Sequence, residues 1–170
     1  EELYDRQETN QFGDERYAIY FMPGEYDESI QPEVGFYTQV SGLGILPTDT
    51  KIQGLSCLAR WLGDDESNHN ACCNFWRSVE NVSIESNTVW AVSQATDMRR
   101  VNIEGALYLH DDYGWCSGGF LADSNITAGN TAVPIFPKVA LLQNFQRFLF
   151  RVGKVIYMNA AFLHAADHVN

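Results

Sequence analysis

Short segments in which apolar and polar residues alternate recur along the chain at intervals of about twenty residues. Residues 81–84, 100–103 and 123–126 share one pattern and each ends in isoleucine, and the successive isoleucines are 19 and 23 residues apart. An alternation with a period of two predicts a half-buried strand. In the third copy, Ser124 takes the inward position of the apolar residue. Further strand-like segments lie upstream, at residues 17–22, 36–40 and 51–54.

The repeat also predicts how these strands are assembled. Short strands repeating about every twenty residues, without helical periodicity between them, are typical of a parallel β-solenoid, whose turns stack ~4.8 Å apart. A leucine-rich repeat needs regularly spaced leucines, and a β-sandwich favours Asn-Gly or Asp-Gly hairpins; the sequence has neither. We therefore expect an all-β protein in which residues 17–126 form stacked parallel strands, with Val82, Ile84, Val101 and Ile103 pointing inward.

Several longer motifs carry a family resemblance. They occupy residues 12–26, 35–44, 74–78, 90–95, 98–101 and 117–124. Together they resemble a family of secreted, mainly bacterial and fungal proteins with a pectin-lyase-like right-handed β-helix, often labelled only by an attached discoidin-like, coagulation factor 5/8 type domain. The resemblance covers roughly residues 10–126 and implies that the chain supplies the N-terminal half of a longer right-handed parallel β-helix.

The last forty residues differ in charge from the rest. Residues 1–130 carry 7 basic and 21 acidic side chains, whereas residues 131–170 carry 4 basic and 1 acidic. We expect residues 1–130 to form the rungs of the β-helix and residues 131–170 to belong to the same domain, either as further rungs or as a capping amphipathic helix. The apolar face of that helix, over residues 139–163, would consist of Leu141, Phe145, Phe148, Val152, Val155 and Phe162.

Composition excludes several classes of protein. The 170 residues are 45% hydrophobic, which excludes a disordered chain, and the net charge of −11 makes nucleic acid an improbable partner. No apolar stretch is long enough for a membrane-spanning helix. The chain begins with Glu1 and no leader follows, so we expect a mature, processed chain or a fragment.

The four cysteines bear on the compartment. In a secreted chain an even count predicts two disulfides, with Cys57 and Cys116 each bonded to one of Cys72 and Cys73, because adjacent cysteines rarely bond each other. The alternative is four buried thiols. Sequons at residues 81–83 and 125–127 agree with secretion.

Aligning the repeats produces three columns of outward-facing residues. The columns are Asn81, Arg100 and Asp123; Ser83, Asn102 and Asn125; and Glu85, Glu104 and Thr127. We expect the second column to form a polar ladder and Arg100 to form an ion pair with Asp123. Glu85 and Glu104, one rung apart at ~5 Å, have the spacing of the two carboxylates of a retaining glycosidase.

A second acidic pair lies in a turn beside aromatic residues. Asp111 and Asp112 are followed by Tyr113 and Trp115, and an aromatic ring is the surface on which a sugar stacks. The candidate catalytic residues are therefore Asp111, Asp112, Glu85 and Glu104, and the candidate substrate-binding residues are Trp115, Tyr113 and Arg100. Both acidic pairs are equally compatible with a solvated surface. We expect Trp61, Trp76 and Trp90 to serve packing.

The predicted function is extracellular and concerns carbohydrate. One interpretation is a polysaccharide hydrolase or lyase; the other is a non-catalytic glycan-binding β-helix or a structural subunit of a larger assembly. The familiar polygalacturonase and pectate lyase motifs are absent, and the fold alone does not decide. No cofactor is specified, although a lyase would use Ca²⁺ against a uronate. Expected partners are a glycan and a protein bound at the open solenoid end or at the basic C-terminal segment.

Overall fold

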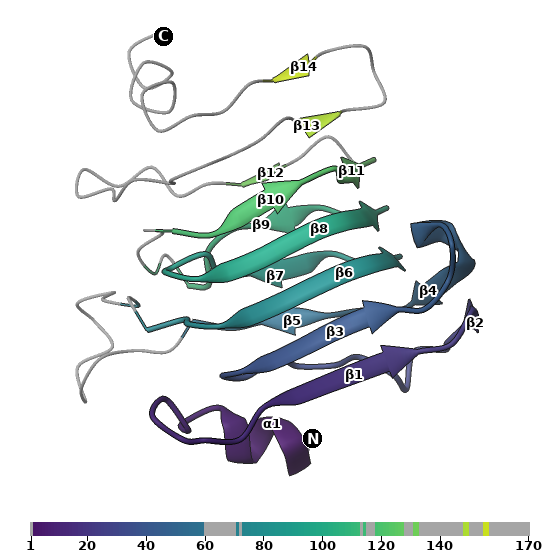
Figure 1. The fold of residues 1–170 in the computed structure, drawn as a ribbon. Coiled ribbons are helices and arrows are strands. Elements are labelled where there is room, and N and C mark those ends of the chain that lie inside the picture. The colour runs from purple at the N-terminus through teal and green to yellow at the C-terminus, as the bar shows by residue number, and fades with distance from the viewer. Residues whose placement is uncertain are drawn as a thin grey trace, which may run out of the picture.

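The computed structural model describes residues 2–59, 71, 73–112, 114, 118–127, 131–132, 148–149 and 155–156. In chain order its elements are α1 (Glu2–Gln7), β1 (Tyr17–Phe21), β2 (Gly24–Glu25), β3 (Thr38–Gly42), the 3₁₀ helix η1 (Pro47–Asp49), β4 (Thr50–Ile52), β5 (Ser56–Cys57), β6 (Arg77–Ile84), β7 (Thr88–Trp90), β8 (Thr96–Ile103), β9 (Leu107–Tyr108), β10 (Phe120–Ala122), β11 (Asn125–Ile126), β12 (Thr131–Ala132), β13 (Phe148–Leu149) and β14 (Val155–Ile156) (Figure 1).

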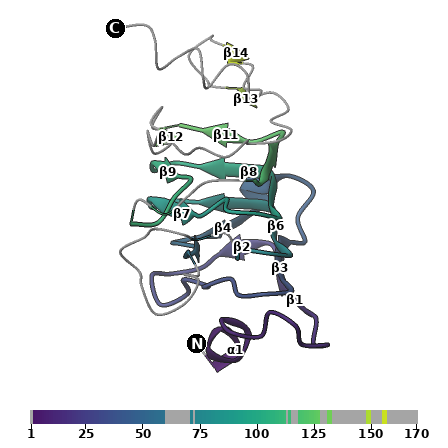
Figure 2. The same ribbon diagram turned by 90° about the vertical axis from the view of Figure 1, so that its left-hand side faces the viewer.

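The strands form a parallel β-helix, as the repeat predicts. In the described part of the chain, one sheet has eight strands, with β1, β3, β6, β8 and β10 side by side, and a second sheet stacks β5, β7, β9 and β12. The pairs within both sheets are parallel. Figure 2 shows the two sheets on opposite sides of one coil, so the chain passes back and forth between them. The expected all-β solenoid is confirmed.

The inward residues are those that the alternation predicts. β6 and β8 pair in a register that places Val82 opposite Val101 and Ile84 opposite Ile103. All four side chains are at most 1% exposed. A parallel β-helix buries one face of each strand against the opposite sheet, so apolar residues two positions apart supply a continuous core along the coil.

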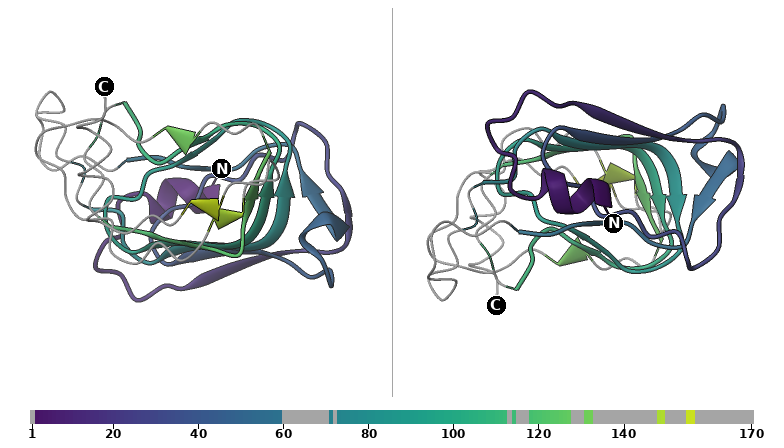
Figure 3. Two further views of the ribbon diagram at one scale, coloured as in Figure 1. Left: turned by 90° about the horizontal axis from the view of Figure 1, so that it is seen from above. Right: turned by 90° about the horizontal axis from the view of Figure 1, so that it is seen from below.

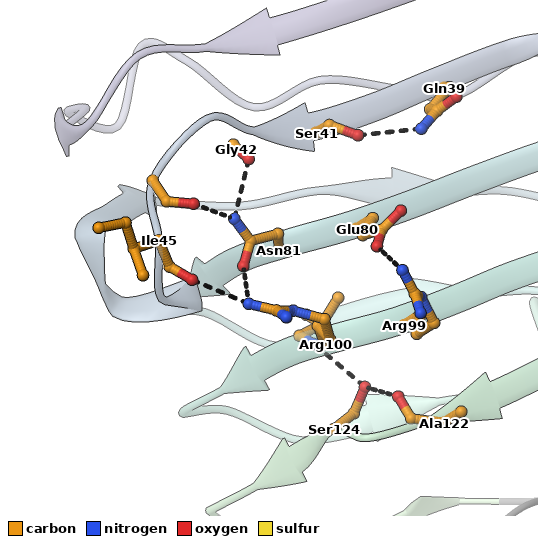
Figure 4. A network of polar contacts seen from close by, with 12 residues as sticks. Gln39, Ser41, Gly42, Ile45, Glu80, Asn81, Arg99, Arg100, Ala122 and Ser124 are labelled. Carbon is orange, nitrogen blue, oxygen red and sulfur yellow. Dashed lines mark hydrogen bonds and ion pairs between the residues drawn. The ribbon is translucent and has the colours of Figure 1, made fainter.

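Each copy of the repeat begins at a bend, which lies within β6, within β8 and directly after β10. Asn81, Arg100 and Asp123 have φ angles of 59°, 53° and 49°, in the left-handed region. Asn and Asp adopt this conformation more readily than most residues, because their short polar side chains hydrogen-bond locally. The Nδ2 group of Asn81 instead bonds to the neighbouring rung, donating to the Gly42 carbonyl at 2.9 Å and the Gly44 carbonyl at 2.7 Å (Figure 4).

The predicted polar ladder is present. Asn125 Nδ2 donates to Asn102 Oδ1 at 2.6 Å, and Asn102 Nδ2 donates to Ser83 Oγ at 3.4 Å. Ser83 Oγ in turn donates to the Pro47 carbonyl at 3.1 Å. The side-chain amides of the two sequon asparagines, Asn81 and Asn125, therefore form hydrogen bonds between rungs, which makes them poor glycosylation sites.

The prediction of an ion pair between Arg100 and Asp123 is wrong. Arg100 Nη2 instead donates to Asn81 Oδ1 at 3.1 Å and to the Ile45 carbonyl at 2.9 Å, toward the preceding rung (Figure 4). The loop between β3 and β4 brings this carbonyl within reach, and it satisfies the guanidinium. The cross-rung ion pair on this face is formed by Arg99 and Glu80.

The N-terminal helix covers one end of the coil, where α1 lies across the opening (Figure 3, right). Gln7 is buried, its Nε2 donates to the Phe36 carbonyl at 2.8 Å, and its own carbonyl accepts from the Phe36 amide at 2.9 Å. Gly35 allows this approach, since a Cβ there would lie 2.8 Å from Gln7 atoms. Such a cap protects the open strand edge from pairing with another chain. Within the described residues no helix could cross a lipid bilayer.

At the other end, β12 pairs in parallel with β9 and so continues the second sheet by one rung. Farther along, β13 and β14 form an antiparallel pair. These two short strands fall within residues 139–163, for which the sequence predicts either a capping helix or a further rung. The rest of that segment lies outside the described residues.

Among the described residues the expected disulfides are absent. Cys57 and Cys73 are buried thiols, whereas Cys72 and Cys116 lie outside the described residues. Cys57 Sγ is 3.7 Å from both Asn74 Nδ2 and Arg77 Nη1, inside the coil. Burial raises the pKa of the Cys57 thiol, against the opposing effect of Arg77.

We expect Cys57 to be inert in the native protein. A fully buried thiol with a raised pKa reacts only through opening of the fold, so its labelling with a chromogenic disulfide should be at least about 100-fold slower than in the unfolded chain. Timed labelling of the native protein and of the unfolded, unreduced protein, followed by peptide mapping, measures this directly. A Cys57 peptide that is protected until reduction would contradict the thiol assignment.

Candidate functional site

The acidic turn that the sequence singles out is only partly described. Asp111 Oδ2 accepts a hydrogen bond from the Ala59 amide at 3.1 Å, so this carboxylate ties two rungs together. Asp112 is exposed at a φ of 40°. Burial lowers the pKa of the neighbouring His110, although both carboxylates oppose this shift. Tyr113 and Trp115, the expected sugar-stacking residues, lie outside the described residues, so this turn stays a prediction.

Glu85 and Glu104 lie where the repeat places them, directly after the paired residues Ile84 and Ile103. Both are exposed, and both contribute to raising the pKa of Lys51. The larger cause of that shift is the contact of Lys51 Nζ with Glu25 Oε1 at 3.0 Å. The two glutamates therefore belong to an exposed charged surface.

A hollow of about 540 Å³ is lined in part by Ser86 and Asn87, the two residues that follow Glu85. Hydroxyl, amide and carboxylate groups dominate its lining, which consists of Ser29, Gln31, Glu33, Gly54, Leu55, Ser56, Ser86, Asn87 and Val89. Its described lining contains no aromatic side chain on which a sugar could stack.

A different groove, of about 670 Å³, combines aromatic and acidic side chains. We call it the Trp76 groove; it is lined by Arg16, Tyr17, Ala18, Tyr37, Thr38, Gln39, Trp76, Arg77, Ser78 and Asp97. Its residues come from the N-terminal ends of β1, β3, β6 and β8 and from the corners that precede them.

The aromatic wall of the groove follows from the repeat. Thr38 pairs with Arg77, so the residues before them, Tyr37 and Trp76, occupy equivalent corners of adjacent rungs. Their φ angles are nearly identical, 54° and 55°, in the left-handed region. Trp76 is 63% exposed, although its rung is otherwise well packed. An exposed tryptophan in a groove is a platform for a flat apolar surface such as one face of a pyranose ring.

The polar side of the groove lies on the next column. Gln39, Ser78 and Asp97 pair across β3, β6 and β8 and alternate with the inward residues Val40 and Val79. Burial raises the pKa of the Asp97 carboxyl. No donor to this carboxylate is found within the described ranges. An exposed carboxylate without a described donor, beside an aromatic platform, is a ready acceptor for sugar hydroxyls.

A buried arginine anchors the wall. Arg77 Nη1 donates to the Val34 carbonyl at 3.0 Å, and its Cζ lies 4.6 Å from the centre of the Phe36 ring. Because Arg77 follows Trp76 and Phe36 precedes Tyr37, this contact fixes both aromatic corners from inside the coil.

The sequence does not predict this site, because the pattern around Trp76 indicates a packing role. Trp90 does serve packing, at 1% exposure, whereas Trp61 lies outside the described residues. The signal for Trp76 is its position relative to the repeat. It precedes its strand by one residue, as Tyr37 does, and therefore falls on a corner instead of an inward position.

Replacing Asp97 with asparagine should stabilise the protein at neutral pH. A carboxyl whose pKa is raised by folding favours the native state while it is protonated, and that contribution is lost as the pH rises through the folded pKa. The substitution therefore has almost no effect near pH 3.5 and raises the stability at pH 7, by up to about 1 kcal/mol given the partial exposure. Denaturant unfolding of both proteins at the two pH values measures this, and an equal difference at both would contradict it.

The chain is similar to known proteins over most of its length. It is 45% identical over 131 residues to an exo-beta-1,3-glucanase from Streptomyces sp. (strain SirexAA-E / ActE), a match that covers 74% of this chain and 21% of the relative. The chain thus spans about a fifth of the length of that curated relative. No protein-family model matches the sequence.

Two solved structures share the fold. The structure of sacteLam55A from Streptomyces sp. SirexAA-E matches with a TM-score of 0.66 at 45% identity, over 74% of this chain and 23% of that one. A variant of sacteLam55A in complex with glucose matches with a TM-score of 0.63 at 40% identity, over 76% of this chain and 24% of that one.

Proposed function

We propose that this chain is a glucan-binding β-helix of a β-1,3-glucan hydrolase, and that the Trp76 groove holds the glucan. The observation that carries the proposal is the 45% identity to an exo-beta-1,3-glucanase. A relative of the same kind has been solved with glucose, and its fold matches that of this chain. An extracellular location, where polysaccharide is met, is part of the same proposal.

Charge favours a neutral polysaccharide over a polyuronate. The chain carries a net charge of −11, and Asp97 places a carboxylate in the groove itself. A polyanionic glycan would need a cation beside each carboxylate, whereas the described lining of the groove offers Arg16 at one end and the buried Arg77, and within the described ranges no cluster of three metal-ligating side chains exists. A neutral glucan needs only a stacking surface and hydrogen-bonding groups, and Trp76, Gln39, Ser78 and Asp97 supply both.

The groove supports binding more strongly than cleavage. Hydrolysis of a glycosidic bond uses a pair of carboxylates, one as the acid and one as the base or nucleophile. Among the described residues that line the Trp76 groove, only Asp97 carries a carboxylate. We therefore assign the groove to glucan binding, and cleavage requires a second carboxylate from outside it. A non-catalytic glycan-binding role is the second candidate, and the same single carboxylate favours it.

Calorimetric titration with oligosaccharides of one length tests the proposal. We expect saturable binding of laminaritetraose, which is β-1,3-linked, and weaker or no binding of cellotetraose and tetragalacturonate. Incubation with laminaritetraose and analysis of released sugar separates a hydrolase from a binding protein. Absence of laminaritetraose binding, or a preference for tetragalacturonate, would overturn the proposal.

A further inference from the structure

We infer that Arg16 is a specificity-determining residue that closes the Trp76 groove at one end and limits stacking to one glucosyl residue, on Trp76. The inference rests on the proposed glucan-binding function and concerns which length of glucan the groove can use.

The aromatic wall continues below Trp76 but is covered there. Tyr37 is the equivalent residue one rung toward the N-terminus, and the guanidinium Cζ of Arg16 lies 3.5 Å from the centre of its ring. Tyr17 pairs with Thr38, so Arg16 itself occupies the corresponding corner of the next rung. The three corners therefore form a column in which Arg16 lies on Tyr37, and Trp76 offers the open platform.

Arg16 is held in this position. Its Nη1 donates to the carbonyls of Gly13 and Glu15, at 2.8 Å each. The Tyr37 hydroxyl donates to the Gln11 carbonyl at 2.6 Å, which fixes the ring beneath the guanidinium. A planar cation over an aromatic face is favourable, so a sugar ring would have to displace it to stack on Tyr37.

The column is open in the other direction. Thr96 pairs with Arg77, so Ala95 is the corner residue of the rung above Trp76. Phe120 pairs with Asp97, which places Gly118 at the corner after that. Within the described part of the chain, these small side chains do not obstruct the groove above Trp76. A glucan bound on Trp76 would therefore extend toward β8 and β10 and end at Arg16.

Removing Arg16 should add a second stacking surface. Adjacent rungs lie ~4.8 Å apart, about the length of one sugar ring, so in Arg16→Ala a second glucosyl residue can rest on Tyr37. We expect laminaritetraose to bind about three- to tenfold more tightly, as one added aromatic contact allows, with methyl β-glucoside unchanged. In the double variant Arg16→Ala/Tyr37→Ala this gain should disappear.

A matched control is available in the same chain. Lys51 is another basic side chain in a cross-rung contact, its Nζ lies 3.0 Å from Glu25 Oε1, and neither residue lines the groove. Lys51→Ala should leave both affinities unchanged, and thermal unfolding of each variant confirms that it folds.

The titrations distinguish the role of Arg16 from glucan binding by the groove. If the unaltered protein binds laminaritetraose but Arg16→Ala binds it equally or more weakly, Arg16 is not the end of the groove and the inference fails alone. If the unaltered protein does not bind laminaritetraose, the proposed function fails and the inference fails with it. Tighter tetraose binding that requires Tyr37 supports both.

Discussion

Replacing Trp76 with alanine will weaken the binding of laminaritetraose by about 10- to 30-fold. Trp76 is 63% exposed in the groove, and it is the open aromatic surface of the column because Arg16 covers Tyr37. An aromatic residue at the centre of a binding site typically contributes ~1.4–2 kcal/mol, which corresponds to this range. Calorimetry and the quenching of tryptophan fluorescence by the sugar both measure the effect.

Two further variants make the Trp76 result specific. Phe12 is 91% exposed and does not line the groove, so Phe12→Ala removes an exposed ring of similar character without changing affinity. Trp76→Phe keeps a smaller platform and should retain part of the binding. Equal affinities for the unaltered protein and Trp76→Ala would show that the sugar binds elsewhere.

The substitution Ile84→Ala will destabilise the fold by about 2–5 kcal/mol. Ile84 is fully buried, paired with Ile52 on one side and Ile103 on the other, so truncation removes buried area and leaves a cavity between two rungs. Denaturant unfolding measures the loss.

Ile45→Ala is the matched control for that prediction. Ile45 is 86% exposed, and Arg100 contacts it only through its backbone carbonyl, which the substitution keeps. We expect its stability to change by no more than about 0.5 kcal/mol. Similar losses at the two positions would contradict the inward register of the repeat.

The fold could be predicted from the sequence because the residues that face inward repeat at a regular spacing. Val82, Ile84, Val101 and Ile103 alternate with polar residues at a spacing of 19, and burial on one face of a strand requires that period. The polar ladder followed from the same alignment, since residues in register on adjacent rungs are within hydrogen-bonding reach.

The side-chain contacts at the bends within β6 and β8 could not be predicted in the same way. Periodicity describes extended residues, whereas Asn81 and Arg100 adopt a left-handed conformation that redirects their side chains. Arg100 consequently reaches the Ile45 carbonyl in the loop between β3 and β4.

The site was missed for a related reason. The sequence placed the chemistry at adjacent acidic pairs, while the groove is assembled from Tyr37, Trp76 and Asp97, which lie on three rungs and are distant in the chain. Only the register brings them together. Trp76 differs from the buried Trp90 by preceding its strand, in register with Tyr37, and recognising this requires the strand boundaries that the structure supplies.

The most direct test of glucan binding in the Trp76 groove is a crystal structure of the protein with laminaritriose. We predict a glucosyl ring stacked on Trp76, with a hydroxyl within hydrogen-bonding distance of the Asp97 carboxylate and the chain extending past Ala95, away from Arg16. Laminaritriose bound in the hollow beside Ser86 and Asn87, with the face of Trp76 unoccupied, would contradict the account.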